Sequence, residues 1–243
     1  MRIAMLSDVH GNRPAFEAVL AQIDDTDVEE IWCLGDLVGY GAEPDECVAL
    51  ARERCVVCLA GNHDLVVTGD IPLSDFSSSA AAAARWTQEN ISKQALSFLR
   101  SLEPSEPDHE VGLYHGSPRD PVWEYVLSTW QADECLDLTD ARVCAVGHSH
   151  VALWFRRDPA GKLDGAQATA GAEQDLSVGE WLINPGGVGQ PRDGDPRAAW
   201  LLLDTESWAV NWKRVEYPID DAARAIADAG LPPVLAERLY SGQ

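Results

Sequence analysis

Five of the six histidines in this chain stand where a short apolar segment gives way to turn-forming residues. Only His109, in a segment rich in Pro and Glu, lies elsewhere. Because polar residues at the carboxyl ends of parallel strands meet at one edge of a sheet, this pattern predicts that distant segments converge. The blocks read Asp8-Val9-His10-Gly11-Asn12, Gly35-Asp36, Gly61-Asn62-His63-Asp64, His115-Gly116 and Gly147-His148-Ser149-His150.

The first 60 residues alternate between strand and helix patterns. Ile3–Leu6, Glu30–Leu34 and Cys55–Ala60 are predicted strands. Between the first two, apolar residues from Phe16 to Ile23 recur at i, i+3, i+4 and i+7, which is one face of a helix. Two units of this kind favour parallel strands joined by helical crossovers, and therefore an α/β fold.

Residues 73–103 read as helical, with a break near residues 90–92, and we expect them to be a helical insertion or a cap over the site. After residue 150, β-strand patterns dominate, and two short helices close the chain. Since no linker or repeat separates these parts, residues 1–243 are predicted to be one α/β domain with two sheets.

The chain has 18 basic and 40 acidic residues, which gives a net charge of −22. This charge argues against nucleic acid and anionic membranes as partners. No stretch approaches the roughly 18 apolar residues of a membrane span, and the apolar run near the N-terminus is too short for a signal peptide. Cys55-Val-Val-Cys58 invites a zinc or redox interpretation, but positions three apart on a strand face opposite ways, which favours core thiols and a cytoplasmic protein.

The blocks have the composition of a site for two metal ions. Imidazole and carboxylate ligands suit Mn, Fe, Zn or Ni, and the sequence leaves the metal open. Asp8 and His10, like His148 and His150, are two residues apart and so lie on one side of an extended chain. Asp36 is the natural candidate for a carboxylate that bridges two cations.

In these residues the sequence resembles the calcineurin-like metallophosphoesterase superfamily, and in particular its small bacterial and archaeal phosphodiesterases. The family pattern is D-x-H, G-D, G-N-H-D/E, H and G-H-x-H, and the chain matches it from residue 8 to 150. The resemblance implies a four-layer αββα sandwich with the metal site at the carboxyl ends of the strands. It also implies one metal held by Asp8, His10, Asp36 and His150, and a second held by Asp36, Asn62, His115 and His148.

The resemblance further implies the roles of residues around the metals. His63, oriented by Asp64, would act as general acid or electrostatic clamp for the leaving oxygen. Asn12 and Arg119 are candidates for substrate contact, Trp86 and Trp123 are weaker ones, and Tyr40 is a candidate for stacking on a base. The loop 184–197 resembles one in small phosphodiesterases of the superfamily. The expected reaction is in-line attack on phosphorus by a hydroxide that bridges the metals.

The expected substrate is a small phosphate ester, with nucleotides as the expected class: phosphodiesters, phosphomonoesters or dinucleoside polyphosphates. Two cations with two carboxylates and a hydroxide leave a local charge of about +1, so the site can attract a phosphate although the chain is acidic. The alternatives are a nuclease and a non-enzymatic interaction module of the same fold. The substrate and the oligomeric state are left open.

Overall fold

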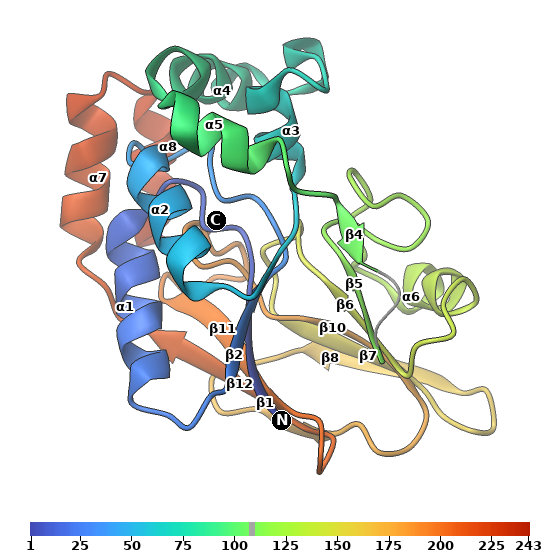
Figure 1. The fold of residues 1–243 in the computed structure, drawn as a ribbon. Coiled ribbons are helices and arrows are strands. Elements are labelled where there is room, and N and C mark those ends of the chain that lie inside the picture. The colour runs from blue at the N-terminus through green and yellow to red at the C-terminus, as the bar shows by residue number, and fades with distance from the viewer. Residues whose placement is uncertain (107–109) are drawn as a thin grey trace.

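Two six-stranded sheets, packed face to face, form the centre of the described part of the molecule (Figure 1). The structure is a computed structural model that describes residues 1–106 and 110–243. The sequence-based placement of His109 in a loop falls outside these residues. No helix in the described ranges is long and apolar enough to cross a membrane.

The first sheet has the strand order β3-β2-β1-β11-β12-β9. The strands β1, β2 and β3 run parallel, as predicted, and β1 is antiparallel to β11. The carboxyl ends of β1 to β3 therefore lie at one edge, where three of the polar blocks follow. The strands span Arg2–Leu6 (β1), Glu30–Cys33 (β2), Val57–Cys58 (β3), Glu173–Asp175 (β9), Ala198–Asp204 (β11) and Ala209–Val215 (β12).

The second sheet has the order β4-β5-β6-β10-β7-β8. Its central strands β5, β6 and β10 are parallel to one another, while β4, β7 and β8 pair in antiparallel fashion. The blocks at His115 and Gly147 follow β5 and β6 at the same end of this sheet. The strands span Ser105–Glu106 (β4), Val111–Tyr114 (β5), Val143–Val146 (β6), Leu153–Arg157 (β7), Leu163–Gln167 (β8) and Glu180–Asn184 (β10).

Helices cover the outer faces of both sheets (Figure 1). The α-helices span Arg13–Asp24 (α1), Pro44–Arg54 (α2), Asn62–Thr68 (α3), Ser78–Asn90 (α4), Lys93–Leu99 (α5), Thr129–Leu136 (α6), Ile219–Asp228 (α7) and Pro233–Glu237 (α8). Two 3₁₀ helices span Leu73–Asp75 (η1) and Arg238–Tyr240 (η2). The break predicted near residues 90–92 is confirmed, since α4 ends at Asn90 and Ser92 caps α5.

The burial pattern of β1 explains the layers. Ala4 and Leu6 belong to the core shared with α1 and α2, whereas Ile3 and Met5 belong to the core between the two sheets. Side chains alternate between the faces of a strand, so an uninterrupted apolar run is buried on both sides. A third core lies between the second sheet and α6. The order helix, sheet, sheet, helix confirms the predicted four-layer αββα sandwich.

Several elements differ from the sequence-based expectation. The strand predicted over residues 55–60 shrinks to the two residues of β3 at the sheet edge, where Val56 is 67% exposed. The helices α3 and α6 and the polar edge strands β8 and β9 were not expected. The prediction of one domain over residues 1–243 stays a prediction.

The segment 73–103 packs mainly on other helices. The helix α4 contacts α3 and η1, and α5 contacts α2 and α3. Only the beginning of the segment reaches the cavity described below, through residues 75–77 and Ala80. If the segment caps the site, only η1 and the first turn of α4 form the cap.

Candidate metal centre and active site

The turns after the parallel strands are bonded to one another. Beyond β1 and β2, the amide of Asp8 donates to the carbonyl oxygen of Gly35 at 3.0 Å, and that of His10 to Asp36 at 2.9 Å. In the second sheet, Gly147 N donates to His115 O at 2.8 Å. These bonds extend the strand pairing past the sheets, so they hold the polar blocks in fixed register.

The side chains of these blocks form two groups of donor atoms. Asp8, His10, Asp36 and His150 make one group, and Asp36, His115 and His148 make the other. Within each group all donor atoms lie within 4.8 Å of one another, and every residue is buried. Asp36 belongs to both groups. Asn62 adjoins the second group, because its Oδ1 lies 3.2 Å from His115 Nε2.

Backbone carbonyl groups set the tautomer of the histidines. The Nδ1 atoms of His10, His115 and His150 lie 3.0, 2.8 and 2.5 Å from carbonyl oxygens, to which they donate. The proton is then on Nδ1, and Nε2 keeps its lone pair. The Nε2 atoms of His10 and His150 face each other at 3.1 Å. Two lone pairs at this separation repel, and a cation between them removes the repulsion.

The carboxylates of the site also lack ordinary partners. Both oxygens of Asp8 and Oδ2 of Asp36 are buried and accept no hydrogen bond of normal geometry from described residues. They face imidazole nitrogens instead: His150 Nε2 lies 3.3 Å from Asp8 Oδ1, and His10 Nε2 lies 3.5 Å from Asp36 Oδ2. Buried polar atoms are normally paired, so these atoms are positioned for something other than the protein.

Burial disfavours charge on five of the prospective ligands. It raises the pKa of Asp8 to about 7 and raises the pKa of Asp36 well above its usual value. It lowers the pKa of His10, His148 and His150 well below the usual value for histidine. A divalent cation reverses the first effect and reinforces the second, because it favours ionised carboxylates and neutral imidazoles. The donor set therefore fits metal ions.

The backbone of the site is unusual. Five of the prospective ligands have positive φ angles between 52° and 61°. Non-glycine residues rarely adopt this left-handed conformation, although Asp and His do so more readily than most. It turns each side chain away from the strand direction and into the shared centre. The five residues are Asp8, His10, Asp36, His148 and His150.

His63 lies at the beginning of α3, beside the donor groups. Its ring centroid is 4.8 Å from that of His10, 4.3 Å from that of Tyr40 and 5.1 Å from that of Phe76. Burial, and after it the charge of Arg192, lower the pKa of His63 to about 3. The side chain is therefore close to the proposed reaction centre and neutral in the free protein.

The structure corrects the expected role of Asp64. Its carboxylate does not orient His63, whose Nδ1 has no hydrogen-bond partner among the described residues. Instead Asp64 accepts from the amides of Gly61, Leu37 and Val38 at 2.9, 3.3 and 3.2 Å. Asp64 follows His63 on a helix, and successive helical side chains diverge. It caps α3 and holds the turn after Asp36.

A cavity of about 160 Å³ opens beside these residues. Tyr40, the candidate for stacking on a base, and Trp123 both line it, whereas Trp86, the other weaker candidate for substrate contact, is not among the lining residues. The sequence had not indicated Arg192, Phe76 or Tyr125 individually, although Arg192 lies in the loop 184–197 that we had singled out. The full lining is Asp36, Tyr40, Asn62, His63, Asp75, Phe76, Ser77, Ala80, Trp123, Tyr125, His148, His150 and Arg192.

Asn12 and Arg119 do not line this cavity, which corrects their expected role. Asn12 caps α1 by accepting from Ala15 N at 3.1 Å, and its Nδ2 donates to Gly189 O at 2.8 Å. The guanidinium of Arg119 is bound by Glu124 at 2.6 Å and by a second carboxylate, Glu134, at 3.5 Å. Both side chains therefore already make hydrogen bonds or ion pairs within the protein.

Comparison with known proteins places the chain. A family model of the calcineurin-like phosphoesterase superfamily domain matches residues 1–207. An uncharacterized protein of Methanocaldococcus jannaschii is 37% identical over 246 residues, which cover 99% of this chain and 98% of that protein. A metallophosphoesterase from Sphaerobacter thermophilus is 40% identical, with a TM-score of 0.90 over 100% of this chain and 99% of that one.

A hypothetical protein of Pyrococcus horikoshii has the same fold, with 20% identity and a TM-score of 0.80 over 100% of this chain and 98% of that one. The family match and the relatives in bacteria and archaea agree with the predicted resemblance. The structure adds that the residues of the family pattern, from Asp8 to His150, meet in one buried centre. The chain belongs to the calcineurin-like phosphoesterase superfamily.

Proposed function

We propose that this phosphoesterase uses two divalent metal ions to hydrolyse small phosphate esters, nucleotides among them. The observation that carries the proposal is the shared position of Asp36 in two groups of buried donor atoms. A carboxylate with one oxygen facing His10 at 3.5 Å and His115 at 3.6 Å is suited to bridge two cations. The family supports the reaction class.

The ligands follow from the two groups. Asp8, His10, Asp36 and His150 would hold one ion, and Asp36, Asn62, His115 and His148 the other. When bound, such ions supply Lewis acidity at phosphoryl oxygens and an activated water for in-line attack. The mixture of imidazole and carboxylate donors suits Mn, Fe, Zn or Ni. The carbonyl partners of the imidazoles fix their orientation and raise their basicity.

His63 is the residue that we assign to the leaving group. It lines the cavity but belongs to neither donor group, so its ring is free to donate a hydrogen bond to the departing oxygen. The ring is neutral in the free protein, and the negative charge of a bound phosphate would favour the protonated form that can release a proton. Phe76 and Tyr40 pack against its ring at centroid distances of 5.1 and 4.3 Å. Their apolar surface limits the access of water to that side of the cavity.

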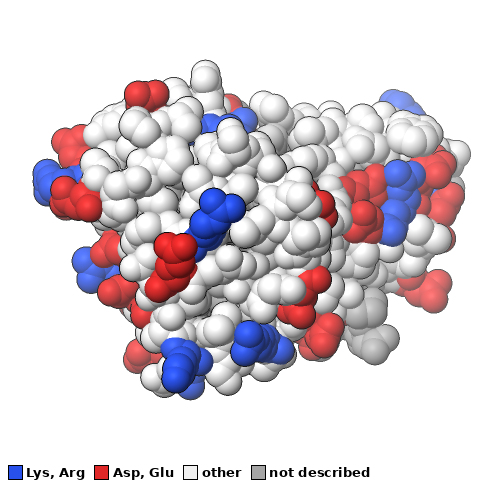
Figure 2. Space-filling model, turned by 90° about the horizontal axis from the view of Figure 1, so that it is seen from above, with Lys and Arg blue, Asp and Glu red and all other residues white. Residues whose placement is uncertain are grey.

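Cavity size and surface charge support a small substrate. A volume of about 160 Å³ holds a phosphoryl group and part of its ester substituent, whereas sites for drug-sized ligands measure about 300–1,000 Å³. In Figure 2, basic side chains stand singly among acidic and uncharged ones on the face seen from above. An extended nucleic acid needs a continuous basic track. A cytoplasmic location stays part of the proposal.

Hydrolysis assays test this function. The metal-free protein and samples loaded with Mn²⁺, Fe²⁺, Zn²⁺ or Ni²⁺ would be assayed with bis-p-nitrophenyl phosphate and p-nitrophenyl phosphate. A panel of cyclic nucleotides, nucleoside monophosphates and dinucleoside polyphosphates would follow. We expect metal-dependent turnover. A folded protein with two bound metal ions and no turnover of any ester would refute the proposal, and faster cleavage of DNA than of small esters would make it a nuclease.

The leaving-group role of His63 has a separate test. We expect His63→Ala to reduce kcat about 10²- to 10⁴-fold for esters with alkoxide leaving groups, which need a proton. The loss should be much smaller for p-nitrophenyl esters, whose leaving group departs without one. Metal content measured by mass spectrometry should not change. An equal loss for both substrate types would contradict a proton-donating role.

A further inference from the structure

The loop between β10 and β11 is bonded to residues of the metal centre from both sheets, namely Asp8, which follows β1, and His150, which follows β6. Its Gln190 carbonyl oxygen accepts from His150 Nδ1 at 2.5 Å, and Arg192 N donates to His150 O at 3.2 Å. On the other side, Gly189 N donates to Asp8 O at 2.9 Å. This loop is therefore held in place by residues of the site, and the side chains that it directs toward the cavity have fixed positions.

Arg192 carries the one side chain of this loop that lines the cavity. A guanidinium N–H donates to the Tyr40 hydroxyl at 3.3 Å and to Gln190 Oε1 at 3.1 Å, and the guanidinium carbon lies 5.6 Å from the Tyr40 ring centroid. Both acceptors are neutral. Its Nε is buried and has no hydrogen-bond partner in the described structure.

Arg192 lacks a carboxylate partner, unlike two other arginines near the site. Arg197, on the same loop, is bound by both oxygens of Asp195 at 2.6 to 3.2 Å, and Arg119 is bound by Glu124. No described carboxylate lies within ion-pair distance of Arg192. A partly buried cation without a counter-ion is costly unless an anion completes the site. The open face of this cation is the cavity that also contains His63.

A phosphoryl group matches these requirements. A guanidinium is planar and presents several N–H groups, and it binds phosphate oxygens more strongly than neutral donors do. The cavity admits little more than this group. Tyr40 adjoins both groups, with its ring centroid 4.3 Å from that of His63 and 5.6 Å from the Arg192 guanidinium carbon. All three residues line the cavity, so the cation and the imidazole would face the same phosphoryl group.

We infer that Arg192 is a substrate-binding residue, which donates hydrogen bonds to a non-bridging oxygen of the phosphoryl group. This inference rests on the proposed function for the identity of the anion. Tyr40 and Gln190 are positioning residues, because they hold the guanidinium through its other N–H groups. Arg192 thus takes the role that the sequence had predicted for Arg119.

Binding of inorganic phosphate to the metal-loaded protein, measured by titration calorimetry, is the decisive test. We expect Arg192→Gln to weaken phosphate binding about 10- to 100-fold, the range for a lost hydrogen bond to a charged group. Arg192→Lys should lie between this variant and the wild type, because it keeps the charge but loses the planar fork. Arg197→Gln, an equal charge change on the same loop, should bind phosphate within about twofold of the wild type.

Metal stoichiometry and melting temperature accompany each titration, so that a damaged centre is recognised, and Arg192→Lys serves if Arg192→Gln does not fold. Equal phosphate affinity in the wild type and Arg192→Lys or Arg192→Gln would overturn the inference. So would the absence of phosphate binding by the wild type. Since the readout is binding, phosphate binding that depends on Arg192 in a protein without esterase activity would refute the proposed function and support the inference.

Discussion

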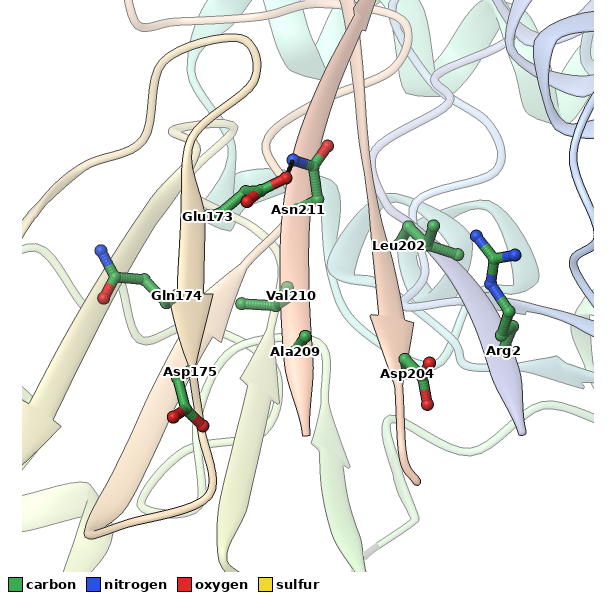
Figure 3. A pocket seen from close by; sticks show the side chains of 9 residues that line it. All are labelled: Arg2, Glu173, Gln174, Asp175, Leu202, Asp204, Ala209, Val210 and Asn211. Carbon is green, nitrogen blue, oxygen red and sulfur yellow. Dashed lines mark hydrogen bonds between the residues drawn. The ribbon is translucent and has the colours of Figure 1, made fainter. Parts of the chain in front are cut away.

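Two cavities of this molecule differ in size and in chemistry. The larger, of about 540 Å³, lies against β9, β11 and β12, and the smaller, of about 160 Å³, lies at the metal centre. Figure 3 shows the larger one, where Asn211 donates to Glu173 at 2.8 Å. Its Arg2 pairs with Asp27, and Asp204 accepts from two backbone amides. No histidine or cysteine is among the residues that line it.

The smaller cavity, by contrast, adjoins several charged side chains that have buried, unpaired atoms. Its neighbours Asp8 and Asp36 keep buried oxygens without ordinary partners, and Arg192 keeps an unpaired Nε. The difference teaches that volume alone does not locate chemistry in this fold. A group of buried charged side chains with unpaired atoms does locate it, because such groups are costly unless a ligand completes them; the larger cavity has one such atom, the Oδ1 of the neutral amide of Asn211.

The largest effect should come from removing the shared carboxylate. We expect Asp36→Asn to lower kcat/KM by about 10³-fold or more, since a metal ion contributes several kcal/mol to transition-state stabilisation. The loss should be accompanied by less than two equivalents of bound metal, measured by mass spectrometry. The matched control is Asp204→Asn in the larger cavity, which should leave kcat/KM unchanged. Equal effects of the two variants would erase the distinction between the cavities.

Metal binding should stabilise the protein. A ligand at 100 times its Kd adds about 2.7 kcal/mol, which corresponds to roughly 5–10 °C in melting temperature for a chain of this size. Scanning calorimetry of the wild type with EDTA and with Mn²⁺ measures the shift, and Asp36→Asn should show a smaller one. A melting temperature that does not respond to saturating metal would mean that the ions do not bind the folded centre in preference to the unfolded chain.

Gly39 provides a sharper probe of the smaller cavity. A Cβ there would lie 2.3 Å from His63 Nδ1, so Gly39→Ala should displace the imidazole and lower kcat/KM about 10- to 100-fold. Gly171→Ala is the matched control: both glycines have positive φ, 89° and 79°, but a Cβ at residue 171 meets nothing within 4 Å. If both variants lose activity equally, the effect comes from the backbone and not from His63.

The smallest effect is predicted for filling the larger cavity. Ala209 is exposed on β12, and Ala209→Leu should change neither kcat/KM nor metal content, with a stability change within about 0.5 kcal/mol. Steady-state assays and urea unfolding measure both quantities. A fall in kcat/KM would show that the two cavities are coupled, and that the chemistry is not confined to the metal centre.

The metal centre was predictable because its signal is local. Each block combines ligands with glycine directly after an apolar strand, so residue identity and strand position appear together in the sequence. Asp64 was not predictable in the same way. A carboxylate beside His63 fits the expected orienting role equally well, and only the helical path of α3 turns it toward the amides of Leu37 and Val38.

The arginines show a second limit of prediction from sequence. Arg119 and Arg192 each follow a proline and lie near a predicted block or loop, and the sequence does not distinguish them. Their roles depend on which carboxylates are near in space. Glu124 and Glu134 reach Arg119 from the same segment of chain and α6, a helix whose pattern had not been recognised. The counter-ions of a side chain are a tertiary property.

The edge strands were missed for a related reason. In β8 only Leu163 is partly buried, and its other residues are exposed, so no alternation of apolar residues marks the strand. Its pairing with β7 is set by backbone hydrogen bonds. By contrast, β1 is buried on both faces and was predicted with its correct end at Leu6.

The left-handed backbone of the ligands has a consequence for anyone who wishes to transplant this centre. Each such residue costs about 1–3 kcal/mol, and five of them together require a sum comparable to the whole stability of an ordinary domain. Placing the five residue types on another scaffold would therefore reproduce the ligands without the left-handed backbone that orients them. The five residues are Asp8, His10, Asp36, His148 and His150. A minimal design must import the paired turns of both sheets, because the surrounding fold supplies the energy that keeps the ligands bent inward.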